Sequence, residues 1–312
     1  MTNMPVIDTR PSDESNLLLH SIGAVERSSG LSKDTLRVWE RRYGFPRPQR
    51  DEHGERVYRS DDIEKLRLIK RLIDRGYRPG KIVDLPAADL RTLTETLGED
   101  DTPPGLQRLI DALKGHRAAE LHSHLAQLMV RDGLDRFILN TVAPLNYHVG
   151  VAWMKGQIEV HEEHVYTEMI QSLLRGAVGS LPASERAPTV LLTTFPNELH
   201  SLGILMVQAL LGGKGANCIS LGTQTPIEDI VAAAKGHQAD VVALSFSAAF
   251  PTGHLLDGLS ELRERLPPRV DLWVGGGHPA LARRNIDGLT VVTRLDEVGA
   301  LLEAWRATHR AR

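Results

Sequence analysis

The spacing of apolar residues along the sequence changes sharply near Pro188. Beyond this point, five short apolar runs alternate with five amphipathic stretches of helical length. The apolar runs are Val190–Phe195, Asn217–Leu221, Val241–Phe246, Leu272–Val274 and Leu289–Val292. Because parallel strands are buried on both faces and are joined by helices, this alternation predicts a doubly wound parallel sheet. Sheets of this kind bind ligands at the carboxyl ends of their strands.

The preceding part of the chain has its apolar residues at helical spacing instead. One stripe comprises Leu106, Leu109, Ile110 and Leu113, and the next comprises Leu121, Leu125, Leu128 and Met129. We therefore expect a four-helix bundle over residues 105–186 and the sheet over residues 187–312. An acidic stretch that contains Pro103 and Pro104 predicts a linker over residues 87–104.

Charge is distributed unevenly along the chain. Residues 20–81 contain 16 Lys or Arg and 10 Asp or Glu, a local charge of +6, whereas the whole chain carries −3 and the remainder therefore −9. A basic module on an acidic body favours a polyanionic partner for the module. A solvated helical surface explains the charge equally well. The polar residues 1–16 predict a disordered tail before it.

Several classes of protein are excluded by what the sequence lacks. It has no run of about 18 apolar residues, so we expect no membrane-spanning helix. The single cysteine, Cys218, allows neither an internal disulfide framework nor a cysteine-rich zinc site. The N-terminus lacks the apolar core of a secretion signal, and the cytoplasm is the expected compartment.

Residues 20–82 contain five segments of a family pattern: Ser21–Val25, Gly30–Glu40, Pro46–Pro48, Arg56–Tyr58 and Asp61–Leu66. They resemble the DNA-binding domain of the MerR family of regulators, and we expect this domain to cover residues 17–86. The resemblance implies a winged helix-turn-helix, with Gly30 at the turn and Ser32 capping the second helix. The polar turn 51–55 would form the wing.

This resemblance implies a double-stranded DNA operator as a partner. Side chains on the outer face of the second helix would lie in a major groove, and two wing residues would contact sugar or phosphate. The expected DNA-binding residues are Lys33, Thr35, Arg37, Arg41, Arg42, Arg56 and Tyr58.

The segment after the first apolar run, Glu198-Leu-His-Ser-Leu-Gly203, resembles the Asp-x-His-x-x-Gly signature of cobalamin-binding domains. After it come Ser245-Phe-Ser247, in place of the family's Ser-x-Leu, and then Gly275-Gly276, at the spacings the family has. The resemblance implies a Rossmann-like (flavodoxin-like) sheet that binds the lower face of a cobalamin.

Each part of this signature has an implied role. His200 would be the lower axial ligand of cobalt, and Glu198 would accept the other ring N–H of the imidazole. Gly203 would let the next helix approach closely, and Ser245 would hydrogen-bond the nucleotide tail of the cofactor. Gly275 and Gly276 would leave room for that tail, whereas Ser247 would make one wall of its slot more polar.

The bundle carries a second signature, Trp153 followed by Glu163 and His164. It resembles the Trp-x9-Glu-His motif of light-sensing cobalamin regulators of the CarH/LitR type, in which the bundle shelters the adenosyl group. The resemblance implies that Trp153 stacks on adenosyl, that Val160 lines the pocket, and that Glu163 and His164 bond the nucleoside. A core tryptophan beside an exposed, charged helix start is the alternative.

One residue departs from that light-sensing pattern. Met154 follows the tryptophan, where the family has a histidine that binds cobalt after light removes adenosyl. A thioether is a weaker ligand for oxidised cobalt than imidazole. The upper ligand of cobalt after the loss of adenosyl would then be Met154, His161, His148 or water.

The resemblance implies a transcription repressor, not an enzyme, that uses adenosylcobalamin. In the dark it would assemble as a homotetramer on its operator, and light would break the Co–C bond and release the DNA. Three alternatives stay open: a light-independent cobalamin sensor, a regulator that has lost its cofactor, and a corrinoid module of a methyltransferase or mutase.

Overall fold

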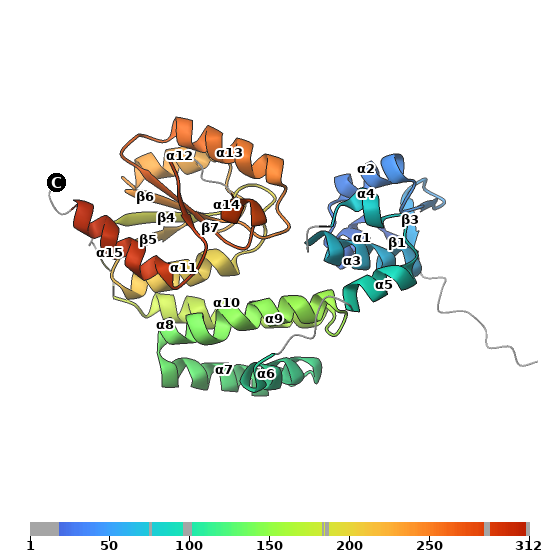
Figure 1. Ribbon diagram of the computed structural model, residues 1–312, viewed down its shortest axis with the longest axis horizontal. Helices are drawn as coiled ribbons and strands as arrows, with labels where there is room; N and C mark the ends of the chain where they lie inside the picture. Colours follow the sequence, from blue (N-terminus) through green and yellow to red (C-terminus); the bar gives the residue numbers. More distant parts are fainter. Residues whose placement is uncertain are drawn as a thin grey trace, which may run out of the picture. The chain divides into compact units, whose positions relative to one another are not determined.

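The computed structural model describes residues 19–74, 77–95, 102–182, 184, 187–283 and 288–309. The chain divides into two compact units at Glu99 and Asp100, and each is described by itself (Figure 1). No helix among the described residues is long and apolar enough to cross a bilayer.

The first unit is a small helical domain with an antiparallel sheet of order β1-β3-β2. Its elements are β1 (Leu19–Ser21), α1 (Ile22–Ser29), α2 (Lys33–Tyr43), β2 (Gln49–Arg50), β3 (Arg56–Arg59), α3 (Ser60–Asp74), α4 (Pro79–Ile82) and α5 (Ala87–Glu95). The polar turn between β2 and β3 is the predicted wing, in which Asp51 Oδ1 accepts the backbone N–H groups of His53 and Glu55 at 3.0 and 2.8 Å.

Local sequence sets the helix-turn-helix. Gly30 ends α1 in the left-handed conformation, with φ of 70°, as the turn requires. The Ser32 hydroxyl then accepts the backbone N–H of Thr35 at 3.2 Å and starts α2, a cap that contributes about 1 kcal/mol. Leu36 and Trp39 face the core of this unit, so the opposite side of α2 stays at the surface.

The predicted linker over residues 87–104 is wrong in its first part. Ala87–Glu95 forms helix α5, which packs on α3 and places the fully buried Leu90 in the same core as Val25 and Leu36. A nine-residue helix is too short to be stable through propensity, and only its packing on α3 makes it a helix. Sequence periodicity is weak over so few residues.

The second unit joins a helical bundle to a parallel sheet. The bundle consists of α6 (Pro104–Lys114), α7 (Ala118–Asp132), the continuous helix α8–η2–α9 (Leu134–Phe137, Ile138–Val142, Ala143–Met154) and α10 (Val160–Gly179). The η2 segment is a π-helical turn, and its buried Ile138 and Val142 face the core that the bundle shares with the sheet.

The sheet has the strand order β5-β4-β6-β7-β8, and every neighbouring pair is parallel. The strands are β4 (Thr189–Thr193), β5 (Asn217–Ser220), β6 (Val241–Ser245), β7 (Asp271–Gly275) and β8 (Thr290–Val292). The helices are α11 (Leu202–Gly213), α12 (Ile227–Gly236), α13 (Thr252–Arg265), α14 (Pro279–Arg283) and α15 (Glu297–His309). The predicted doubly wound, flavodoxin-like sheet is confirmed.

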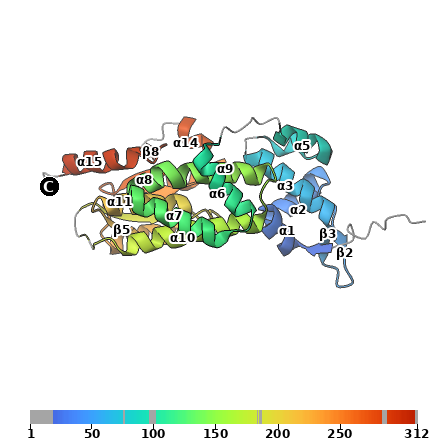
Figure 2. The same ribbon diagram turned by 90° about the horizontal axis from the view of Figure 1, so that it is seen from below.

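The side chains of β4 alternate between two cores. Val190 and Leu192 pack with α11, α15 and the bundle, whereas Leu191 packs with α12 and α13 on the other face. Helix α11 is apolar around most of its circumference because it lies between the sheet and α10. Figure 1 shows this layering, and Figure 2 shows α6 and α7 on the outer side of the bundle.

The single cysteine gives a direct check on this packing. Cys218 on β5 lies against the core shared by bundle and sheet, and burial raises the pKa of its thiol to about 12. The lower thiolate fraction, partly offset by higher nucleophilicity, is expected to make alkylation about a hundredfold slower at pH 8 than in the unfolded chain. Iodoacetamide labelling with and without urea measures this; equal rates would contradict the burial of Cys218.

Candidate functional site

The connection between β4 and α11 carries the predicted acid and imidazole. Glu198 is 1% exposed, whereas the His200 side chain is 67% exposed. The Glu198 Oε1 accepts a hydrogen bond from His200 Nδ1 at 2.6 Å and one from the His200 backbone N at 3.0 Å. Because the carboxylate can only accept, the proton of the neutral ring is on Nδ1. The lone pair of the ring is therefore on Nε2, and the side chain that carries it is exposed.

The second oxygen of Glu198 is held from the neighbouring strand. The Oε2 atom accepts the backbone N–H and the hydroxyl of Ser247, each at 2.8 Å. Ser247 follows β6, where the family pattern has a leucine that could not donate a side-chain hydrogen bond. A polar chain therefore runs from Ser247 through Glu198 to His200. The family pattern predicts only a polar wall at Ser247, and its bond to Glu198 could not be predicted because 49 residues separate the two.

The hydrogen bonds and charges around Glu198 keep its carboxyl group ionised. Burial raises the pKa of the Glu198 carboxyl, but the hydrogen bond and charge of His200 and the backbone N–H of Ser247 outweigh it, so the pKa lies below its ordinary value of 4.5. The stability that this carboxylate contributes is therefore present above about pH 4.5 and is lost as the pH falls through its lower folded-state pKa.

The start of α11 approaches the end of β6 more closely than a side chain would allow. A Cβ at Gly203 would lie 2.4 Å from the Ser245 Oγ. Ser245 is 9% exposed, so its hydroxyl lies beneath the first turn of α11 and next to the carboxyl edge of the sheet. That Ser245 bonds the tail of a cofactor stays a prediction.

Two glycines at the end of β7 complete this edge of the sheet. A Cβ at Gly275 would lie 2.8 Å from the Val292 backbone oxygen. Gly276 has φ of 111°, and its Cβ would lie 2.2 Å from the Phe246 backbone oxygen. Both positions accept only glycine because backbone from a neighbouring strand occupies the space.

The predicted cap lies where α9 ends and α10 begins. Trp153, in the last turn of α9, is half-buried against the core of the bundle. Val160 begins α10, and the Glu163 carboxylate one turn later accepts the Thr167 hydroxyl at 2.6 Å. His164 is 68% exposed, and its Nδ1 lies 3.1 Å from Glu163. These four residues therefore lie at one end of two adjacent helices, the end of α9 and the start of α10. Figure 1 shows that this end extends past the sheet.

A polar pair that the sequence patterns do not reveal, the buried Tyr166 and the half-buried Asn146, ties this cap to α11. The Tyr166 hydroxyl donates to Asn146 Oδ1, and the Asn146 amide in turn lies 3.9 Å from the sulfur of Met206 on α11. Burial raises the pKa of Tyr166 well above its ordinary value, so it stays a donor. The signal was a tyrosine and an asparagine within apolar helices, which by itself does not reveal the partner.

The three residues proposed for the upper face have different surroundings. The Met154 side chain lies outside the part of the chain that the structure describes. His148 pairs with the Thr102 hydroxyl at 3.1 Å and lines a cavity of about 240 Å³ on the α6 side of α9. His161 stacks on His116, with ring centroids 5.7 Å apart. Both histidines therefore have neighbours unrelated to the loop of His200.

In the first unit, α2 presents a basic stripe. Lys33, Arg37 and Arg41 are exposed and recur every four residues, so they lie on one face of the helix. Arg42 lies over the ring of Tyr43, with 5.3 Å from its guanidinium carbon to the ring centre. The Thr35 hydroxyl instead bonds the capping Ser32 at 2.9 Å.

Two wing residues differ from expectation. Tyr58 is 1% exposed, so the prediction that its side chain reaches the DNA backbone is wrong; alternation along β3 turns it into the core. The Arg56 guanidinium pairs with Glu40 at 2.8 Å, which raises its pKa through that hydrogen bond and charge. The ion pair braces the wing against α2.

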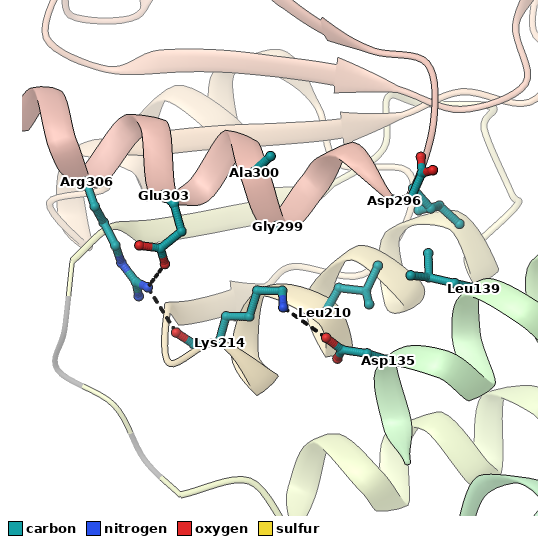
Figure 3. Close-up of a pocket in the computed structure, with 10 residues that line it drawn as sticks. Asp135, Leu139, Leu210, Lys214, Asp296, Gly299, Ala300, Glu303 and Arg306 are labelled. Carbon is teal, nitrogen blue, oxygen red and sulfur yellow. Dashed lines mark hydrogen bonds and ion pairs between the residues drawn. The ribbon is translucent and has the colours of Figure 1, made fainter. Parts of the chain in front are cut away.

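A cavity of about 570 Å³ lies between α8, α11 and α15 (Figure 3). Its charged side chains already have partners: Lys214 pairs with Asp135 at 2.9 Å, and the Arg306 guanidinium donates to Glu303 and to the Lys214 backbone oxygen. It borders the C-terminal half of α11, whereas His200 precedes the N-terminal end. The cavity is therefore not part of the His200 site.

Comparison with known families matches all three regions. The MerR HTH family regulatory protein model matches residues 20–88, and two B12 binding domain models match residues 106–175 and 188–299. The fold of the second unit resembles the monomethylamine corrinoid protein of Methanosarcina barkeri, with a TM-score of 0.52 and 17% identity over 63% of this chain and 96% of that one.

Two relatives share most of the chain. The HTH-type transcriptional repressor CarH of Myxococcus xanthus is 30% identical over 284 residues, which cover 85% of this chain and 92% of CarH. The HTH-type transcriptional repressor CarA of the same organism is 32% identical over 237 residues, which cover 73% of this chain and 76% of CarA. The chain therefore belongs to the MerR family of transcription regulators that carry a cobalamin-binding domain.

Proposed function

We propose that this regulator is a cytoplasmic repressor that binds adenosylcobalamin through His200 and releases its operator when light cleaves the cofactor. The observation that carries the proposal is the exposed imidazole fixed by a buried carboxylate, since this is the arrangement that orients a histidine for a metal. The resemblance to two repressors supports the sign of regulation.

The residues present fit the cofactor. The His200 Nε2 offers a nitrogen to cobalt, and the Glu198 carboxylate holds the ring in the tautomer that ligation needs. Gly203, Gly275 and Gly276 let the start of α11 and three strand ends pack closely at the edge of the sheet that carries the His200 loop. When bound, adenosylcobalamin would supply a Co–C bond that light can break.

The cap is proposed to respond to the upper ligand. Trp153 offers an aromatic platform, and the Glu163 carboxylate offers an acceptor for ribose hydroxyls. Loss of adenosyl would leave this end of α9 and α10 without its contact, and we propose that the homotetramer then dissociates. Several DNA-binding units on one assembly bind an operator far more tightly than one alone.

Gel filtration tests the light switch. The adenosylcobalamin complex, run in the dark and again after green light, is expected to elute as a tetramer and then as a smaller species. The Trp153→Ala variant should lose the dark assembly. An unchanged elution volume in light would overturn the light switch and leave cobalamin binding intact.

Met154 favours a second candidate function, a cobalamin sensor that does not need light. A thioether in place of imidazole would hold the cleaved cofactor weakly. Comparing dark operator binding with adenosyl-, methyl- and hydroxocobalamin separates the two functions. A sensor of cobalamin itself should bind DNA similarly with all three.

The polar chain behind His200 makes a specific prediction. Replacing Glu198 with glutamine removes the charge that orients the ring, and cobalamin affinity should fall by about 10- to 100-fold. Ser247→Ala leaves the backbone N–H bond to Glu198 in place, so its effect should be smaller. Spectroscopic titration with hydroxocobalamin measures both; wild-type affinity in Glu198→Gln would contradict this role.

The basic stripe on α2 makes another prediction. Arg37→Ala and Arg41→Ala should each weaken operator binding, and each variant that removes a phosphate contact should lower the slope of log affinity against log salt by about 1. Tyr58→Phe should leave the slope unchanged because the ring is buried. Fluorescence anisotropy at several salt concentrations measures these slopes. Unchanged slopes in both arginine variants would show that the stripe does not contact the phosphates.

A further inference from the structure

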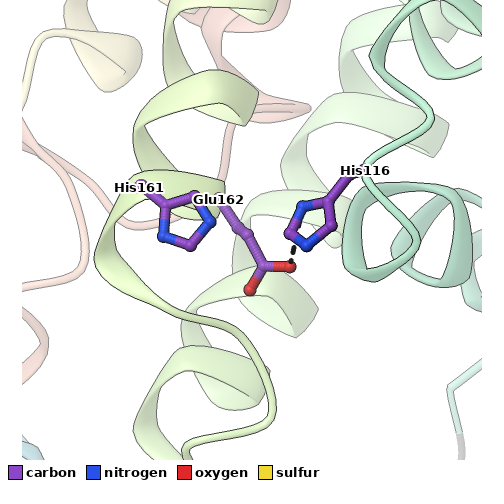
Figure 4. A group of neighbouring side chains, drawn as sticks. All are labelled: His116, His161 and Glu162. Carbon is purple, nitrogen blue, oxygen red and sulfur yellow. Dashed lines mark ion pairs between the residues drawn. The ribbon is translucent and has the colours of Figure 1, made fainter.

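A second cluster of metal-ligating side chains lies in the bundle, apart from the His200 loop. His116 lies in the turn after α6, and His161 and Glu162 lie in the first turn of α10 (Figure 4). One ligand atom from each residue lies within 4.8 Å of the others. Two chain segments separated by more than 40 residues thus bring two imidazoles and a carboxylate to one point.

Glu162 is the fixed member of this cluster. Its side chain is 8% exposed, and its Oε2 accepts the Glu159 backbone N–H at 2.6 Å, which is half of the capping box of α10. The capping bond orients the other oxygen, Oε1, which lies 3.7 Å from His116 Nδ1. Among the described residues, Oε1 receives no hydrogen bond. Oε1 is not among the fully buried polar atoms without a partner, so this oxygen of a largely buried side chain is still within reach of a cation.

The two rings complete a three-atom face. His116 and His161 are stacked at 25° between ring planes, and both side chains are exposed to solvent. An ion therefore has an open approach, and water has room to fill a fourth position. Ligands at about 2.0–2.2 Å in a tetrahedron lie about 3.4 Å from one another, so the 3.7 Å between His116 and Glu162 needs a small adjustment, and separations of up to 4.8 Å need the exposed rings to move closer.

We infer that His116, His161 and Glu162 bind one divalent transition-metal ion of the zinc class, with water in the remaining position. Two imidazole nitrogens and one carboxylate oxygen favour zinc over magnesium or calcium, which prefer oxygen ligands. The backbone hydrogen bond to Oε2 is the outer contact that ligating carboxylates commonly have. This inference does not depend on cobalamin.

The ion would join the α6–α7 turn to the start of α10. The same turn of α10 carries Glu163 and His164 of the proposed cap, so the metal would hold that end of the bundle in place. This use of His161 also removes it from the candidates for the upper face of the cofactor.

The test is a zinc titration of the metal-free full chain against a competing chromophoric chelator. The wild-type protein is expected to bind one equivalent and to melt at a higher temperature with zinc, because the ion binds only the folded chain. His116→Asn and His161→Ala should each weaken zinc at least about tenfold. Asparagine suits position 116, where φ is 54°, because it tolerates this conformation.

Matched variants separate this site from adventitious binding. His122→Ala removes an exposed histidine from α7 and should keep one tight equivalent, as should His200→Ala. Glu162→Gln retains an acceptor for the capping bond but removes the charge, so it should fold and still lose zinc. The proposal is overturned if the wild type binds no zinc, or if His116→Asn and Glu162→Gln bind it as tightly as the wild type.

Discussion

Replacing His200 with alanine is expected to lower cobalamin affinity by about a hundredfold or more, because it removes the proposed metal ligand itself, and disturbing only a ligand's partner already costs 10- to 100-fold. Any cofactor that still binds should show the spectrum of cobalt without a protein imidazole. Absorption spectra of the protein after gel filtration with adenosylcobalamin in the dark measure both effects.

The controls follow from the geometry. His200 is 67% exposed, but its ring donates to the buried Glu198, so its removal should lower the unfolding free energy by only about 1–3 kcal/mol. His237→Ala removes another exposed histidine of the same unit and should leave affinity and spectrum as in the wild type. If His200→Ala kept the wild-type spectrum and affinity, another group would be the lower ligand.

Replacing Gly276 with alanine is expected to destabilise the sheet-containing unit by about 3–4 kcal/mol, through overpacking and strain at positive φ. A Cβ there would lie 2.2 Å from the Phe246 oxygen and 2.8 Å from the Phe246 nitrogen, both backbone atoms. The Phe246 N–H also donates to the Gly275 oxygen at 2.9 Å, so the strand cannot move away freely. The shift of the urea midpoint for this unit measures the effect.

Gly277 is the matched control. A Cβ there meets no atom within 4 Å among the described residues, and its φ is ordinary. Gly277→Ala should therefore change stability by less than about 0.5 kcal/mol. Equal effects of the two substitutions would show that the close approach at Gly276 does not limit the fold. Cobalamin affinity of Gly277→Ala then reports on the space beside the glycines without a folding defect.

The strands and most helices could be predicted because periodicity records burial directly. All five apolar runs became strands in the expected order, and Ser32 capped α2 where the serine preceded a helical pattern. The pairing of Glu198 with His200 was also local, since two residues separate them in one loop. The hydrogen bond between Ser247 and Glu198 is not local, because 49 residues separate the two and Ser247 follows a neighbouring strand.

Two expectations failed for the same physical reason. The family pattern predicts Tyr58 at the surface of the wing, but the pleat of β3 turns it inward. The sequence predicts a linker over residues 87–95, but Leu90 packs in the core of the first unit. In both cases the favourable burial depends on which surface is adjacent, and periodicity over so few residues carries too little information about it.

Patterns along the chain are enough to establish the order of the elements, the strand–helix alternation of a parallel sheet, and the family. Which side chains meet depends on packing: Ser247 behind Glu198, Tyr166 on Asn146, and His116 beside Glu162. Such contacts join residues that are far apart in the sequence, and only the packing of the folded chain brings their side chains together.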